Sequence, residues 1–258
     1  MVIRRIREHV IAHNWFAVTV DLAIVMLGVF LGTQVSNWND DRLERAQAHD
    51  YRLQIIAELR SNEQDLDARK TYYRQVRNHA LATLAGLDRP LSRRDQAFVV
   101  EAYQASQVWL RPVIRAGYDE MIGAGLSAKV GDRAARSRLT TFYSQIRQFD
   151  VTALNTTAYR DRVRRAISYP LQQEINRRCG DRVTYLASGA QIAVLPERCE
   201  ASFDPALVRS SLDRIEAAGL EGDLTRHIAD LDQKLEGFDR FSRLSREVRQ
   251  LLQQEADR

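Results

Sequence analysis

The side chains that most often carry out chemistry are scattered along this sequence and form no known catalytic motif. His9 and His13 are four residues apart, but no glutamate stands between them, as the HExxH motif of zinc proteases requires. His49, His79 and His227 stand alone, and the sequence has no glycine-rich phosphate loop, nucleophile elbow or CxxC pair. The sequence therefore predicts no metal, no cofactor, no small-molecule substrate and no enzymatic activity.

One stretch in the middle of the chain combines a tyrosine, two acids and two glycines. Tyr118 precedes Asp119 and Glu120, and Gly123 and Gly125 follow. Glycine adopts positive φ at little cost, so this pair of glycines predicts a tight turn. The alternative is that they line a cleft beneath Tyr118, either for a partner or for a ligand. An enzyme with a dispersed site around these residues is the competing function.

Asp21 is the only formally charged residue in an apolar run over residues 15–36. A carboxylate at the centre of a bilayer costs about 2.5–3.5 kcal/mol and less toward either end, which makes Asp21 a functional candidate. The alternative is that Asp21 lies near the membrane surface and is hydrated there. Gly28 and Gly32 have the GxxxG spacing and share nearly one helix face with Asp21, so we expect two such helices to associate.

The same apolar run predicts a transmembrane helix over residues 15–38. At 1.5 Å per residue, residues 15–36 span roughly 33 Å, which matches a hydrocarbon core of ~30 Å. Trp15 and Trp38 bracket the run, as interfacial tryptophans do. The alternatives are a buried helix of a soluble protein, which is rarely apolar all round, and a cleaved signal peptide. The run ends without a small-x-small cleavage site, which favours a retained anchor.

The flanking charges predict the orientation. Arg4, Arg5 and Arg7 precede the run, whereas Asp40 and Asp41 follow it. The positive-inside rule then places residues 1–14 in the cytoplasm and residues 39–258 in the periplasm of a bacterium. The basic charge is mostly arginine, which suits a GC-rich bacterial genome. The predicted location is therefore the bacterial inner membrane, with lipid as one partner and nucleic acid excluded by compartment.

Cys179 and Cys199 are the only cysteines, and both fall in the predicted periplasmic part. An oxidising compartment favours a disulfide between them, although two unrelated buried thiols are the alternative. Between them, residues 182–187 and 191–195 resemble two short strands around a glycine turn. We therefore expect a β-hairpin over about 179–199, stapled at its base by the disulfide, which is worth about 3 kcal/mol in the chain-entropy view.

The remaining sequence predicts helices. Apolar residues recur at three- and four-residue steps over 42–87, over about 132–167 and over 224–251, and Pro170 should kink or end the second of these helices. Shorter helices are expected at 95–106 and 117–124. A further helix should begin with Asp204 as N-cap and end near Gly219. The fold class is mainly α, an elongated antiparallel bundle of long, coiled-coil-like helices after the membrane helix.

An arginine-rich stretch over residues 160–182 predicts a solvated helix face, diluted as it is by acids. The alternative is a patch for anionic lipid headgroups or for an acidic partner.

Two stretches resemble an uncharacterised family of bacterial single-pass membrane proteins. The first is the acidic apolar span with its exit Gln34-Val35-Ser36-Asn37-Trp38-Asn39-Asp40, which is similar to a QxNNWNE signature of that family. The second runs from Gly117 to Leu126 and is followed by paired aromatics between Leu139 and Tyr143. The resemblance covers residues 15–150 and implies the topology and a helical fold, but no activity. The hairpin departs from the family pattern.

These observations favour a non-enzymatic, membrane-anchored helical module. Its expected role is protein–protein interaction, as a scaffold or a sensor in the cell envelope, through self-association or with another envelope protein.

Overall fold

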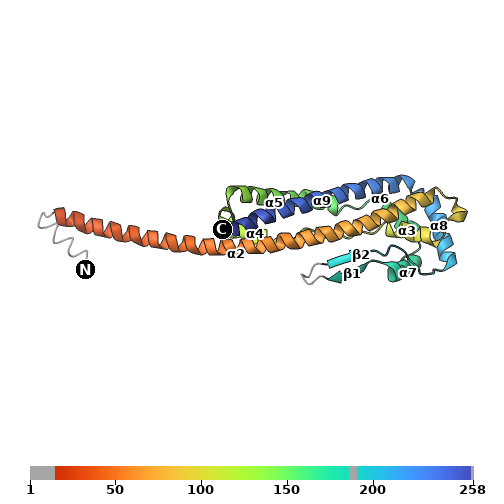
Figure 1. The fold of residues 1–258 in the computed structure, drawn as a ribbon, viewed down its shortest axis with the longest axis horizontal. Helices are drawn as coiled ribbons and strands as arrows, with labels where there is room; N and C mark the ends of the chain where they lie inside the picture. The colour runs from red at the N-terminus through yellow and green to blue at the C-terminus, as the bar shows by residue number, and fades with distance from the viewer. Residues whose placement is uncertain (1–14, 186–190, 257–258) are drawn as a thin grey trace.

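The computed structural model describes residues 15–185 and 191–256. It has one very long helix, α2 (Trp15–Leu87). The first part of α2, residues 15–40, projects from the molecule, and its second part, residues 41–87, lies inside a helical bundle (Figure 1). The mainly α fold, the elongated antiparallel bundle and the small hairpin are confirmed. The predicted cytoplasmic tail, residues 1–14, lies outside the described residues.

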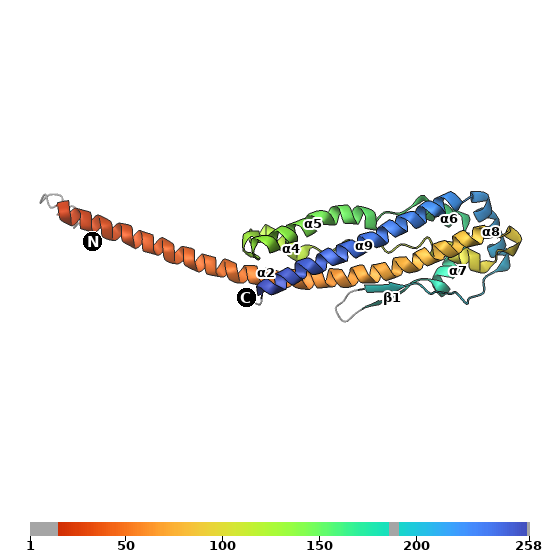
Figure 2. The same cartoon turned by 45° about the horizontal axis from the view of Figure 1, so that its top comes forward.

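The bundle consists of the second part of α2, the antiparallel helix α9 (Glu221–Ala256) and α5 (Arg133–Ala153), which lies along α9 (Figure 2). Shorter helices close its ends and sides. They are α3 (Gln96–Gln104), α4 (Ala116–Gly123), α6 (Ala158–Ala166), α7 (Tyr169–Cys179) and α8 (Pro205–Ala218), with 3-10 turns η1 (Leu91–Arg93) and η2 (Ser127–Lys129).

A heptad of buried residues, with alternating steps of three and four residues, runs along both α2 and α9. This spacing keeps one narrow face of each helix against its partner along the whole length. In α2 these positions are Ile55, Leu59, Asn62, Leu66, Arg69, Tyr73, Val76, Ala80 and Thr83. In α9 they are Leu224, His227, Leu231, Lys234, Phe238, Phe241, Ser245, Val248 and Leu252.

The α9 face differs from the apolar stripe expected from the sequence. Ile228, Leu235 and Leu244 are only partly buried, whereas the polar side chains of His227 and Lys234 take full core positions. The reason is the spacing of the buried positions along the helix. Apolar residues that repeat every 3.6 residues would drift away from a long partner helix, whereas a heptad, which repeats every 3.5 residues, stays in contact with it.

Ion pairs across the α2–α9 interface mark its antiparallel register. Arg249 forms a bidentate pair with Glu63, with Nε–Oε1 and Nη2–Oε2 distances of 2.8 and 3.1 Å. Two further pairs, Lys70–Asp239 and Arg77–Asp232, follow toward the far end of α2. Partly exposed pairs contribute little stability, so the apolar heptad positions hold the two helices together and the pairs select the register.

The single helix expected over about 132–167 is wrong, because α5 ends at Ala153 and two further helices, α6 and α7, follow it. The break falls at Asn155-Thr156-Thr157, whose short polar and β-branched side chains disfavour a helix interior. Pro170 lies in the first turn of α7, where its missing N–H is not needed, so it starts a helix and does not end one.

The hairpin and the disulfide are confirmed. Strand β1 (Arg182–Tyr185) pairs antiparallel with β2 (Gln191–Val194), and Cys179 is bonded to Cys199 with a Cα–Cα distance of 5.5 Å. Strand β2 packs on α2: Ala193 and Leu195 are buried, and the Leu195 N–H donates to Gln75 Oε1 at 3.0 Å. Because a lone hairpin is marginal in water, this docking and the disulfide together hold it in place. The expected glycine turn lies outside the described residues.

Helix α8 begins and ends as the sequence predicts. The Asp204 carboxylate accepts the Ala206 N–H at 2.8 Å, and Gly219 ends the helix with a left-handed φ of +58°.

No other described segment packs against the first part of α2. Its apolar window has a mean hydropathy of 1.9, and none of that window is buried. By length and composition, it is the helix among the described residues that is able to span a membrane.

Candidate functional site

The predicted association face lies on the free part of α2. A Cβ added to Gly28 or Gly32 would meet nothing within 4 Å, so the groove along these glycines is open. Asp21 is half-buried, and its Oδ2 has no hydrogen-bond donor among the described residues. The three residues share one helix, and nothing among the described residues tests an association through them, so self-association through this face stays a prediction.

The turn predicted at Gly123 and Gly125 uses only one of the two glycines. Gly125 adopts a φ of +72°, whereas Gly123 is the last residue of α4 and needs no positive φ. Tyr118 points inward and stacks on Tyr143, with ring centroids 3.9 Å apart. The tyrosine of this motif is therefore part of the packing between α4 and α5.

A buried carboxylate that the sequence did not reveal lies beneath this pair of rings. Glu58 of α2 accepts the Gly117 N–H at 2.7 Å with Oε2 and the Tyr143 hydroxyl with Oε1. Burial, the largest effect, raises the pKa of Glu58, while the two donors lower it. Because each oxygen has a donor from a different segment, Glu58 joins α4 and α5 to α2.

The acids next to Tyr118 do not share a site with it. Asp119 pairs with Arg115 on the surface at 2.6 and 2.8 Å, and Glu120 accepts from Gln54 at 3.3 Å. Tyr118 turns into the core, away from both carboxylates. The alternative of an enzyme assembled around these three residues therefore gains no support from their arrangement.

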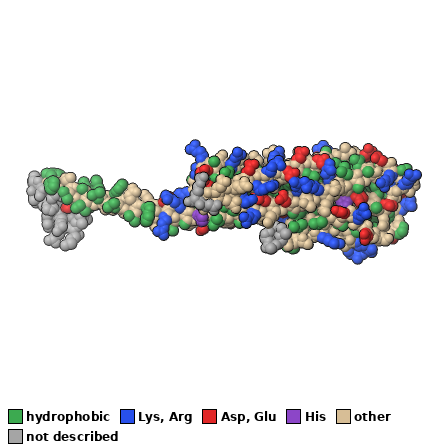
Figure 3. Space-filling view, in the orientation of Figure 1, with side chains coloured by type: hydrophobic (Ala, Val, Ile, Leu, Met, Phe, Trp, Pro, Cys, Tyr) green, Lys and Arg blue, Asp and Glu red, His purple; other side chains and the backbone are tan. Residues whose placement is uncertain are grey.

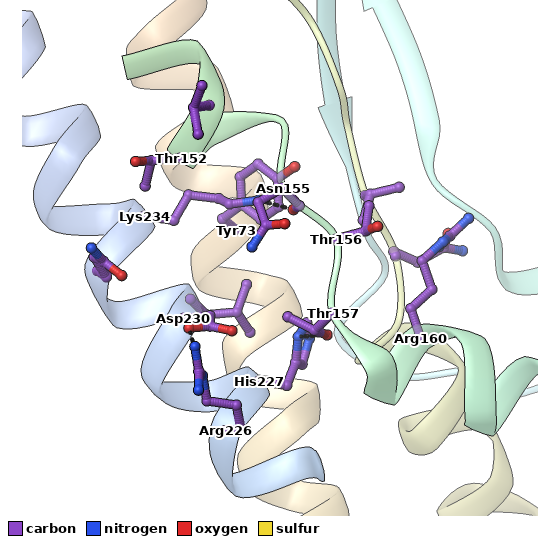
Figure 4. A pocket seen from close by; sticks show the side chains of 15 residues that line it. Tyr73, Thr152, Asn155, Thr156, Thr157, Arg160, Arg226, His227, Asp230 and Lys234 are labelled. Carbon is purple, nitrogen blue, oxygen red and sulfur yellow. Dashed lines mark hydrogen bonds and ion pairs between the residues drawn. The ribbon is translucent and has the colours of Figure 1, made fainter. Parts of the chain in front are cut away.

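The most distinctive polar site is a cavity of about 310 Å³ between α9, α2 and the connection from α5 to α6. Figure 4 shows Lys234 and Asn155 on one side of it and Thr157 and His227 on another. Most of the residues that line the cavity are polar, and they come from segments far apart in the sequence. They are Tyr73, Gln107, Val108, Val151, Thr152, Asn155, Thr156, Thr157, Arg160, Arg226, His227, Asp230, Leu231, Gln233 and Lys234.

Lys234 is the unusual residue of this cavity, because only 6% of it is exposed and it occupies a heptad core position. Its ammonium donates to the Asn155 carbonyl at 3.0 Å and lies 4.6 Å from the centroid of the Tyr73 ring. It makes no ion pair with a carboxylate of the described chain. Burial, the largest effect, lowers the pKa of Lys234 to about 8, and Asp230 acts in the opposite direction.

His227 is held in one neutral tautomer at the floor of the cavity. Its Nε2 lies 2.8 Å from the Ala105 carbonyl and therefore carries the proton, so Nδ1 accepts from the Thr157 hydroxyl at 2.7 Å. Burial lowers the pKa of His227, which keeps the ring uncharged. Thr157 precedes α6 but makes no capping bond, since its hydroxyl is used by His227.

The charges around the cavity leave an excess of positive charge. Arg226 at the rim pairs with Asp230 at 3.1 Å, and the Arg160 guanidinium donates to the Ser106 carbonyl. The lining therefore contains three cationic side chains, Arg160, Arg226 and Lys234, and one carboxylate, that of Asp230. The arginine-rich stretch expected to be a solvated face contributes one of its members, Arg160, to this site.

Sequence reasoning missed the cavity because its residues come together only through the fold. One signal was present: a heptad drawn through the last helix places His227 at a core position between Leu224 and Leu231, and Lys234 at one between Leu231 and Phe238. A lysine there is conspicuous in a chain whose other lysines are Lys70 and Lys129. No group of three or more His, Cys, Asp or Glu side chains in the described ranges is placed to hold a metal.

Comparisons with family models, with curated proteins and with solved structures gave no match to this chain. The family resemblance of residues 15–150 therefore stays a prediction.

The first prediction concerns Glu58. Its folded-state pKa lies above the ordinary value of 4.5, so its protonated form favours folding. This stability is present below pH 4.5 and is lost as the pH rises through the folded-state pKa. Glu58→Gln removes this titration. As the pH rises from 4.5 to 7.5, the melting temperature of the wild type should therefore fall relative to that of the variant. Melting of the full chain in detergent micelles measures it.

Tyr143→Phe is the matched variant. It removes a donor that lowers the pKa of Glu58, so it should destabilise the protein by about 1–3 kcal/mol and steepen the loss of stability with pH. Parallel pH profiles for the wild type and Glu58→Gln would contradict the account of a buried carboxylate.

Proposed function

We propose that this chain is a single-pass protein of a bacterial inner membrane whose periplasmic helical domain acts in protein–protein interaction, as an envelope scaffold or sensor. The observation that carries the proposal is the continuity of α2. One helix of 73 residues contains both the apolar, unpacked segment and the core of the bundle.

The membrane assignment is supported by the surface of the first part of α2. Figure 3 shows apolar side chains around this projecting segment, whereas acidic and basic side chains mingle over the bundle. Trp15 and Trp38 are both exposed near its ends. An exposed apolar helix of this length is unfavourable in water and favourable in lipid.

The orientation is supported by the flanking charges and by the disulfide. The arginines before residue 15 and the acids after residue 38 follow the positive-inside pattern. The bond between Cys179 and Cys199 is the kind that persists in the periplasm and is rare in the cytoplasm.

The bundle begins almost directly where the apolar segment ends. Lys129 of η2 pairs with Asp41 and with Glu44, one and two turns beyond Trp38. Arg52 then donates to the carbonyls of Val130 and Glu255 at 2.7 and 2.9 Å. With no linker between the two parts of α2, a tilt or rotation of the membrane helix moves the bundle with it, as a scaffold or a sensor requires.

The hairpin offers the kind of surface that a protein partner uses. Strand β1 is exposed along its length, with Tyr185 70% exposed and Val183 48% exposed, and it pairs with β2 on one side only. An unpaired strand edge with apolar side chains is a common docking element. The family resemblance also implies a membrane protein and no chemical activity.

The second prediction tests the topology. A C-terminal alkaline phosphatase fusion to the full chain should be active, because that enzyme matures only in the periplasm. A C-terminal green fluorescent protein fusion exported by the same route should stay dark. An inactive phosphatase together with a fluorescent fusion would reverse the orientation.

The third prediction tests self-association. The carboxylate of Asp21 gains a partner, and the backbones approach closely at Gly28 and Gly32, when two such faces pack together. Gly28→Ile should fill the groove and reduce the signal of an in-membrane helix dimerisation reporter several-fold. Asp21→Asn should largely preserve the signal, because the amide still seeks a hydrogen-bond partner.

The matched control is Phe30→Ile, on another face of the same helix, which should leave the signal unchanged. Equal signals for the wild type and Gly28→Ile would show that the glycines are incidental and would remove self-association from the proposal.

A further inference from the structure

We propose that the cavity beside Lys234 binds a small organic anion through its carboxylate. This inference concerns a ligand site and does not depend on the interaction role proposed above. The cavity volume of about 310 Å³ is at the lower end of the range of small-molecule sites.

The buried ammonium is the first argument. A charged group in a core position is costly unless an opposite charge or several hydrogen bonds compensate for it. Lys234 has three N–H donors, and within the described chain its contacts are one carbonyl and the face of Tyr73. A carboxylate oxygen in the cavity would supply the missing partner.

The neighbouring charges lead to the same conclusion. Arg160 and Arg226 border the cavity together with Lys234, and the Asp230 carboxylate is engaged by Arg226. Arg69, which pairs with Asp65 and lies over the Phe238 ring, also lowers the pKa of Lys234. His227 is neutral and has both ring nitrogens occupied. The field inside the cavity therefore favours an anion.

Neutral polar groups complete the site. Thr152, Asn155 and Thr156 line the same opening, and Figure 4 shows Asn155 at the head of Lys234 and Thr156 farther away, toward Arg160. Hydroxyl and amide groups of this kind fix the orientation of a carboxylate that a lysine attracts. Leu231 and Val151 contribute apolar surface for a short carbon skeleton.

The position of the cavity gives binding a structural consequence. Asn155, Thr156 and Thr157 belong to the break between α5 and α6, whereas Lys234 and His227 belong to α9. A ligand held between them would tie this break to the core helix pair and would stabilise the bundle.

The test uses the small number of lysines. The chain contains only Lys70, Lys129 and Lys234, so full-length protein labelled with ¹³Cε-lysine in detergent micelles gives three side-chain resonances that can be titrated separately. We use succinate as the probe, against sodium chloride at equal ionic strength. With succinate, the apparent pKa of Lys234 should rise from about 8 toward the ordinary value of 10.5, because an adjacent anion favours the charged form.

Lys70 and Lys129 are internal controls, because both already pair with carboxylates at the surface. Their titrations should be the same in succinate and in chloride. Succinate should also raise the melting temperature of the wild type and of Lys70→Met, whereas Lys234→Met should lose this response. Methionine is an unbranched side chain only one atom shorter than lysine, and it lacks the ammonium with its charge and its three N–H donors.

A Lys234 resonance that titrates identically in succinate and chloride would overturn the proposal. Equal displacement of all three lysine resonances would overturn it as well, because it would show general screening and no site. Both readings come from the wild-type protein, so they hold even if Lys234→Met fails to fold.

Discussion

The packing of α9 along the second part of α2 is the interaction on which the other elements depend. The two helices meet through heptad positions occupied by leucines, aromatic rings and a few polar groups over the length of the bundle. Each fully buried leucine or phenylalanine in such a seam contributes about 1.5–3 kcal/mol. Helix α5 packs on α9 through Phe142 and Phe149, whose rings stack on Phe241, and β2 lies on α2. Without the α2–α9 pair, none of these smaller elements has a surface to pack on.

The same helix that forms this pair also supplies the apolar segment. Because α2 continues from Trp15 to Leu87 without a break, the bundle cannot turn independently of that segment. Near the point where α2 enters the bundle, Lys129 forms an ion pair with Asp41, and Arg52 donates hydrogen bonds to the carbonyls of Val130 and Glu255. These contacts attach the η2 segment and the end of α9 to α2. The fold is therefore a rigid extension of one helix, and its geometry suits a role in which position relative to a membrane matters.

Polar side chains interrupt the seam at the cost of some stability. Asn62 and Arg69 of α2 and Lys234 of α9 occupy positions that apolar residues would fill more favourably. The side-chain amide of Asn62 donates to the Ile114 carbonyl at 2.8 Å and accepts the Ile114 N–H at 3.0 Å, so it fixes the segment before α4. Lys234 lacks such full compensation, which is why the cavity beside it differs from the rest of the core.

The parts of this structure that the sequence predicted are those with local signals. The hairpin follows from two strand-like runs between cysteines, α8 from Asp204 and Gly219, and the long helices from apolar periodicity. The parts that it did not predict depend on distant partners. The buried position of Glu58 depends on its hydrogen bonds with Gly117 and Tyr143. That of Lys234 depends on its contacts with Tyr73 and Asn155. The break after α5 was missed because its apolar pattern continues into α6 while the backbone turns.

The central claim is that α2 joins the apolar segment to the bundle as one rigid helix. The most direct test measures the distance between two spin labels, attached at Val35→Cys and Ala57→Cys, by pulsed electron paramagnetic resonance on full-length protein in lipid nanodiscs. Both sites are exposed, and the native cysteines are bonded and do not react with the label. A continuous helix predicts one narrow distance distribution centred near ~33 Å, from 1.5 Å per residue. A broad distribution, or one centred at a clearly shorter distance, would mean a hinge between the two parts of α2 and would contradict the account.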